Sequence, residues 1–251
     1  MKKILKFLFN LIVFFNPKFE NGYKMKQIGT KYGGYSIYEN FTKDPIIISC
    51  GVGEDVTFDV EMIDRYNAKI LLIDPTPRAI KYYEMLKLRF GENGSKKYNE
   101  SGRIDPFLYD MSKVHDKNLL FENKAISKTN DKKMELFYPL NNEHVSLSVN
   151  KKSPDQKKFI ATTVNLDNII KKFSFEKIDI LKLDVEGAEL EVLEDIINKK
   201  IFPKQLLIEY DIRRNKNLKN KIILSKVHKK LLTYYKLIYI NEKGDFTYLK
   251  K

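Results

Sequence analysis

The chain has 251 residues, enough for one sizeable core with at most a small appendage, and 43% of them are hydrophobic, as in ordinary globular proteins. Its net charge of +13 comes largely from lysines spread in pairs along the whole sequence. This spread indicates a compositional bias rather than a dedicated nucleic-acid stripe, so we expect no nucleic-acid partner. The single cysteine, Cys50, excludes an internal disulfide and a thiolate metal site and fits a reducing, cytoplasmic compartment.

An apolar N-terminal segment, residues 1–20, precedes the main domain at residues 21–251. Its core, Ile4 to Phe15, is too short to span a bilayer as a helix, and no small-residue cleavage site follows it. Two interpretations stay open. The segment either lies in the membrane interface at the cytoplasmic face, or it packs as a helix on this domain or a partner.

Predicted strands and helices then alternate along the chain. A strand or hairpin is expected at residues 32–38, followed by buried strands at 46–50, 69–73, 178–183 and 205–209. The intervening helices are expected at residues 55–66, 78–90, 188–198 and 218–234, and a final antiparallel hairpin at 237–240 and 246–249. This alternation predicts an α/β fold with a mostly parallel sheet and an antiparallel edge.

Residues 91–158 lack helical periodicity and are expected to form most of an irregular, β-rich cover over one rim of the sheet. A short strand is expected near residues 107–109, and further strands at 134–138 and 160–164. Substrate choice is expected to reside in this cover.

Glycines and carboxylates gather where the first two buried strands end, which is where open α/β sheets bind ligands. Gly51 and Gly53 would let the backbone approach a cofactor, and Asp74 stands where an acidic side chain reaches ribose hydroxyls. The third glycine of dinucleotide enzymes is absent, because the run continues as Glu54 and Asp55. Their charges suit the ammonium and sulfonium of S-adenosylmethionine better than a pyrophosphate.

A second acidic group follows the strand at residues 178–183. Asp184, Glu186 and Glu189 crowd this strand-to-helix corner. Helix capping by Asp184 and a solvated Glu189 would be ordinary structural roles. The position at the expected crevice favours a functional role for Asp184 and Glu186 and leaves Glu189 open.

Several segments, in their order and spacing, resemble the FkbM family of S-adenosylmethionine-dependent methyltransferases over about residues 45–211. They are ISCGVGEDVTFDVEM, LLIDPTPRAI, ENKAISKTNDKKMELF, TTVNLDNIIKKF and IDILKLDVEGAELEVLEDI, of which KLDVEGAE is the most specific part. The resemblance implies a class I methyltransferase fold, a doubly wound and mostly parallel seven-stranded sheet with a β-rich insertion. It also implies methyl transfer to a hydroxyl of a sugar, glycan or related small-molecule acceptor.

Position by position, the resemblance places the two glycines against the methionine part of the cofactor, Asp74 on the ribose, and two apolar residues beside the adenine. Ser49 stands where the family usually has an acidic residue, and Asp55 where it has a glycine, so contacts to the methionine part are expected to differ. The candidate cofactor-binding residues are Gly51, Gly53, Asp55, Asp74, Ala125, Ile126 and Asp184.

Methylation of an alcohol requires alignment of the acceptor and removal of its proton. Asp184 is the first candidate base, with Glu186 and Glu209 behind it, because each follows a strand on the crevice side. His144 would serve if the cover closed over the acceptor. A metal-assisted reaction ranks below a metal-free one, since no other ligand cluster supports it.

Three other functions stay open. An NAD-type oxidoreductase would share the glycines and Asp74 but needs the missing third glycine. A basic RNA-binding or RNA-methylating protein would fit the charge, although a carboxylate-rich pocket suits a polyanion poorly and the Asn-Pro-Pro-aromatic turn of base-amine methylation is missing. A non-catalytic, membrane-bound scaffold on the same fold is the third.

Overall fold

The computed structural model describes residues 17–41, 43–100, 102–140, 146–211 and 218–251. The apolar segment at residues 4–15 lies outside these ranges, so its membrane contact stays a prediction. Within the described ranges, no helix has the length and apolar character needed to cross a membrane.

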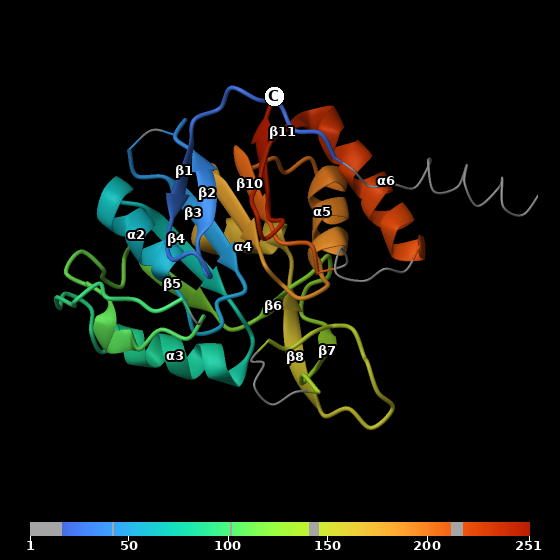
Figure 1. Ribbon diagram of the computed structural model, residues 1–251. Helices are drawn as coiled ribbons and strands as arrows, with labels where there is room; N and C mark the ends of the chain where they lie inside the picture. The colour runs from blue at the N-terminus through green and yellow to red at the C-terminus, as the bar shows by residue number, and fades with distance from the viewer. Residues whose placement is uncertain (1–16, 42, 101, 141–145, 212–217) are drawn as a thin grey trace, which may run out of the picture.

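A mixed sheet of seven strands forms the core, in the order β11-β12-β10-β9-β3-β4-β5 (Figure 1). The strands are β3 (Ile46–Cys50), β4 (Lys69–Ile73), β5 (Leu119–Glu122), β9 (Ile180–Leu183), β10 (Gln205–Ile208), β11 (Tyr235–Ile240) and β12 (Phe246–Lys250). The run from β10 to β5 pairs in parallel throughout, whereas β12 is antiparallel to both β10 and β11. The predicted α/β class and C-terminal hairpin are confirmed, and the predicted parallel pairing holds for that run within a mixed sheet.

Helices cover both faces of this sheet. They are α2 (Thr57–Tyr66), α3 (Pro77–Lys87), α4 (Leu166–Phe173), α5 (Glu189–Asn198) and α6 (Leu218–Tyr234). One hydrophobic cluster joins α2 and α3 to the sheet, and a second joins α4, α5 and α6. The central strands are therefore buried on both sides, which explains why their sequences are continuous apolar runs rather than alternating ones.

Two smaller β structures flank the core. An antiparallel hairpin of β1 (Met25–Ile28) and β2 (Tyr35–Tyr38) precedes it. A three-stranded sheet of β6 (Ala125–Ile126), β8 (Lys158–Val164) and β7 (Lys133–Phe137) projects from one side of the molecule in Figure 1. This second sheet is the β-rich cover that the sequence predicts.

The prediction of a short strand near residues 107–109 is wrong. Pro106–Leu108 forms a 3₁₀ turn instead, because Pro106 fixes its own φ and Asp105 Oδ1 accepts a hydrogen bond from the Phe107 amide at 2.9 Å. The sequence pattern also does not indicate β5 or α4. β5 is four residues long, and α4 begins where Asn165 caps the Asn168 amide.

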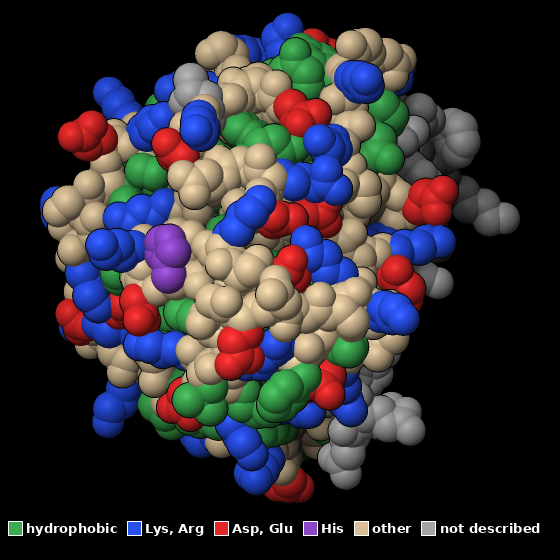
Figure 2. Space-filling view, turned by 90° about the vertical axis from the view of Figure 1, so that its left-hand side faces the viewer, with side chains coloured by type: hydrophobic (Ala, Val, Ile, Leu, Met, Phe, Trp, Pro, Cys, Tyr) green, Lys and Arg blue, Asp and Glu red, His purple; other side chains and the backbone are tan. Residues whose placement is uncertain are grey.

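Charges of both signs mingle on the molecular surface. On the face shown in Figure 2, Lys and Arg side chains are interspersed with Asp and Glu. Such mixing is typical of a solvated surface rather than a track for a polyanion. The expectation of no nucleic-acid partner stays a prediction.

Candidate active site

A cavity of about 330 Å³ opens beyond the carboxyl ends of the central strands. The structure brings every candidate cofactor-binding and catalytic residue to its wall: Gly51, Gly53, Asp55, Asp74, Ala125, Ile126, Asp184, Glu186 and Glu209. Glu189 is not among the lining residues, and His144 lies outside the described part of the chain.

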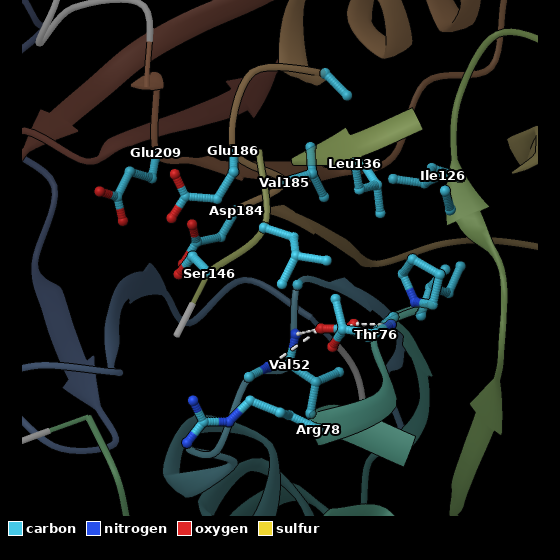
Figure 3. A pocket seen from close by; sticks show the side chains of 18 of the residues that line it. Val52, Thr76, Arg78, Ile126, Leu136, Ser146, Asp184, Val185, Glu186 and Glu209 are labelled. Carbon is cyan, nitrogen blue, oxygen red and sulfur yellow. Dashed lines mark hydrogen bonds between the residues drawn. The ribbon is translucent and has the colours of Figure 1, made fainter. Parts of the chain in front are cut away.

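The cavity has a polar end and an apolar end (Figure 3). The carboxylates of Asp184, Glu186 and Glu209 lie side by side at one end, whereas Ile126 and Leu136 lie at the other. The apolar end comes from β6 and β7, so the small sheet closes the cavity on this side. A ligand that fills the space would present an apolar group to the small sheet and a polar or cationic group to the carboxylates.

The turn after β3, residues 51–54, is termed the glycine turn. Gly51 has a φ of +83°, and a Cβ there would lie 1.7 Å from the Asp184 carbonyl oxygen. Gly51 is thus required by the close approach of the neighbouring strand end. At Gly53, with a φ of +55°, a Cβ would meet no atom within 4 Å. Gly53 therefore leaves its backbone open to the cavity, as the sequence predicts for a residue against a ligand.

Asp74 holds the glycine turn in place. Its Oδ2 accepts hydrogen bonds from the amides of Val52, at 2.9 Å, and Gly53, at 3.2 Å. Its Oδ1 accepts from the amide and hydroxyl of Thr76, at 2.8 and 2.6 Å, where α3 begins. The carboxylate is 5% exposed. A ribose contact would therefore be made in addition to four existing hydrogen bonds.

Asp55 has structural partners that the sequence does not indicate. Its Oδ1 accepts from the Thr57 amide at 2.9 Å, at the start of α2, and its Oδ2 accepts from the Thr30 hydroxyl at 3.2 Å. Glu54 pairs with Arg78 at 2.9 Å. Glu54 and Asp55 thus bind the protein itself. The carboxylates of Asp184, Glu186 and Glu209 are therefore the stronger candidates to bind a cationic ligand group.

The turn after β9, residues 184–187, is termed the acidic turn. Glu186 has a φ of +48°, which is unusual for a residue with a side chain. Its carbonyl accepts hydrogen bonds from the Ser148 hydroxyl at 2.8 Å and the Val149 amide at 3.3 Å. The capping role considered for Asp184 is wrong, because α5 has Ala188 as its N-cap and no side-chain cap.

Two residues at this site are not found by reasoning from the sequence. Tyr35 in β2 donates a hydrogen bond from its hydroxyl to Asp184 Oδ2 at 3.3 Å. Lys182 in β9 donates from Nζ to the Gly51 carbonyl at 2.9 Å. A lysine inside the apolar run ILKL is a signal for Lys182, whereas nothing in the sequence links Tyr35 to a residue so far along the chain.

Burial shifts the pKa values of two side chains near the cavity, Glu189 and Cys50. Burial raises the pKa of Glu189 to about 8, against a hydrogen bond from the Gly187 amide that lowers it, and the nearby charge of Asp184 raises it further. The Glu189 carboxyl is therefore largely protonated at neutral pH rather than solvated. Burial raises the pKa of the Cys50 thiol to about 12, so this thiol is inert as a nucleophile at neutral pH.

In the described part of the chain, no three or more His, Cys, Asp or Glu side chains group in a way that could hold a metal ion. The carboxylates of Asp184, Glu186 and Glu209 thus share a cavity wall without forming such a group.

Comparison with known proteins gives one family. A family model described as the methyltransferase FkbM domain matches residues 39–223, a range that includes the glycine turn, Asp74 and the acidic turn. No curated protein matches the chain. Among solved structures, a chain from the crystal structure of the fibrillarin/Nop5p complex is similar at 11% identity, with a TM-score of 0.42 over 83% of this chain and 73% of that chain.

Proposed function

Because the chain belongs to the FkbM methyltransferase family, we propose that it is an S-adenosylmethionine-dependent O-methyltransferase acting on a hydroxyl of a sugar, glycan or related metabolite. The observation that carries this proposal is the division of one cavity into an apolar end and a carboxylate-lined end, joined by the glycine turn. The acceptor class follows from the family resemblance.

The residues of the cavity fit such a cofactor. Ala125, Ile126 and Leu136 would hold the adenine, the glycine turn with Asp74 the ribose and methionine part, and Asp184 the cationic centre. The open space at Gly53 supports this assignment, since a side chain there would fill the place where a ligand meets the backbone. When bound, S-adenosylmethionine supplies an electrophilic methyl group.

The chain's own task is then to align a hydroxyl and take its proton. Asp184 is the first candidate base, because its carboxylate lines the cavity and its Oδ2 is oriented by the Tyr35 hydroxyl. Glu186 and Glu209 lie beside it in Figure 3 and are the second candidates.

An NAD-type oxidoreductase is the second enzyme hypothesis. It would use the same cavity, but a dinucleotide would place its pyrophosphate at the glycine turn. At that turn Asp74 already accepts from the amides of Val52 and Gly53, and Glu54 pairs with Arg78, so these donors are not free for a pyrophosphate.

Binding and turnover experiments test the proposal in two stages. Isothermal titration of the protein with S-adenosylhomocysteine and with NAD is expected to show binding of the first only; binding of NAD alone would favour the oxidoreductase. Transfer of labelled methyl from S-adenosylmethionine is then measured on a panel of mono- and oligosaccharides, with and without EDTA. Activity that survives the chelator supports the metal-free reaction, and activity lost with it supports a metal-assisted one.

A further inference from the structure

Lys182 is an unusual residue for the middle of a sheet. It lies on β9, between Ser49 of β3 and Leu207 of β10, and it is only 4% exposed. Buried lysines are rare unless a partner offsets the loss of hydration. The partner here is the Gly51 carbonyl, 2.9 Å from Nζ, so the lysine ties the glycine turn to β9.

The same ammonium contacts a second residue of the cavity. Its Nζ lies 5.2 Å from the centre of the Tyr35 ring, and Lys243 approaches that ring at 5.8 Å. Phe58 packs edge-on against Tyr35 with the ring centres 5.9 Å apart. Tyr35 is thus fixed by cation–π and aromatic contacts, and it is 3% exposed.

The fixed ring points its hydroxyl at the acidic turn, where it donates to Asp184 Oδ2 at 3.3 Å. Burial and the charge of Asp184 raise the pKa of Tyr35 well above its usual value, so this hydroxyl stays a donor. Contacts therefore run from the Gly51 carbonyl through Lys182 and Tyr35 to the Asp184 carboxylate. They join the glycine turn to the acidic turn.

We propose that Lys182 and Tyr35 are positioning residues with separate tasks: Lys182 fixes the glycine turn for the cofactor, and Tyr35 aims the Asp184 carboxylate at the place of the transferred methyl. The proposal rests on the proposed function. A purely structural role would be different, because loss of either side chain would then lower stability without changing how tightly the folded protein binds a ligand or which ligand charge the cavity prefers.

Two probes separate these roles without an acceptor. S-adenosylhomocysteine has a neutral sulfur at the reacting position, whereas sinefungin carries a protonated amine there. A carboxylate aimed at this position favours the cation, so the wild-type protein is expected to bind sinefungin more tightly, on the order of ten-fold. The ratio of the two dissociation constants, measured by isothermal titration, therefore reports the placement of Asp184.

Tyr35→Phe removes only the hydroxyl. We expect the sinefungin preference to fall several-fold while affinity for S-adenosylhomocysteine stays within about two-fold of the wild type. Tyr235→Phe is the matched control, since Tyr235 is also buried and its hydroxyl donates to the Pro203 carbonyl at 2.9 Å, away from the cavity lining. The control is expected to keep the wild-type preference.

Lys182→Met keeps the length of the side chain and removes its charge and donors. We expect both probes to bind on the order of ten-fold more weakly, with their ratio close to wild type, because the glycine turn serves both ligands alike. If this variant does not fold, Lys182→Arg and Lys182→Gln are measured instead. Lys182→Arg keeps a cationic donor and is expected to bind both probes more tightly than Lys182→Gln, which lacks the charge.

The outcomes are distinct. An unchanged preference in Tyr35→Phe, or a wild-type protein that binds both probes equally, overturns the role of Tyr35 and leaves cofactor binding standing. Wild-type affinity in Lys182→Met overturns the role of Lys182. Failure of the wild-type protein to bind either probe contradicts the proposed function itself.

Discussion

The glycine turn and the acidic turn follow neighbouring strands and reach the same cavity, yet they are built differently. Each contains two residues with positive φ. In the glycine turn both are glycines, and Asp74 accepts two of the turn's amides. In the acidic turn one of them is Glu186, which must adopt a conformation that costs a side-chain residue about 1 kcal/mol or more.

This difference separates the tasks of the two turns. The glycine turn presents relaxed backbone to a ligand, and the carboxylates of Glu54 and Asp55 are occupied with protein partners. The acidic turn contains a strained residue, Glu186, with a positive φ. Hydrogen bonds from Ser148 and Val149 to the Glu186 carbonyl stabilise this conformation. Strain that the surrounding structure maintains is common where side chains must face a ligand. We therefore expect binding to depend on the first turn and chemistry on the second.

The largest effect is expected from Gly51→Ala. A Cβ would lie 1.7 Å from the Asp184 carbonyl oxygen at a φ of +83°, so the ends of β3 and β9 would have to separate. We expect a loss of about 4 kcal/mol in the free energy of unfolding, or no folded protein. Gly53→Ala is the matched control: a Cβ there meets nothing, and the expected cost is about 1 kcal/mol. Urea unfolding measures both, and equal losses would contradict the close approach of the two turns.

Asp184→Asn tests the acidic turn. Replacing a general base by an amide is expected to lower the rate of methyl transfer by about 100-fold or more. Binding of S-adenosylhomocysteine is expected to change only a few-fold, since the neutral sulfur places little demand on the carboxylate. Single-turnover assays with the best saccharide of the panel give the rate. A wild-type rate would shift the role of base to Glu186 or Glu209.

Glu189→Gln tests the burial behind the acidic turn. The pKa of Glu189 is about 8 in the folded protein against an ordinary value of 4.5. The contribution of this group to the free energy of unfolding is therefore fully present below pH 4.5 and is lost as the pH rises through 8. The expected loss is about 1 kcal/mol per pH unit within that window. Urea unfolding from about pH 5 to 8 should show a flatter profile for the variant; parallel profiles would mean that Glu189 is ionised when folded.

The smallest effect is expected from Arg78→Ala. Arg78 pairs with Glu54 at 2.9 Å, but its side chain is 43% exposed, so water screens the pair. The expected change in the free energy of unfolding is below about 1 kcal/mol, with cofactor affinity nearly unchanged. A large loss of affinity would mean that the glycine turn depends on Glu54 as well as on Asp74.

The sequence predicts the central strands well because they carry continuous apolar runs. Ile46–Cys50 and Lys69–Ile73 are found at the predicted bounds. The sequence pattern does not indicate β5, because this strand is short and follows a polar connection. It forms a strand through its parallel pairing with β4. The strand expected at residues 107–109 fails because a local Asp–Pro turn outweighs the aromatic residues there.

The site was predictable to the extent that its residues follow predicted strands. Seven of the nine candidates line the cavity for this reason, whereas Ala125 and Ile126 lie on β6 and are expected at the cofactor only from the family resemblance. The partners of Asp55 and the contact of Tyr35 with Asp184 were not predictable, because they join segments far apart in the chain. The burial of Glu189 also depends on tertiary packing, and a glutamate in the first turn of a helix is more often solvated.

A crystal structure with S-adenosylhomocysteine tests the central claim most directly. We predict that the adenine lies against Ala125 and Ile126, that the ribose lies near Asp74, and that the sulfur faces Asp184. A ligand bound outside this cavity, or one bound with its adenine at the carboxylate end, would contradict the account.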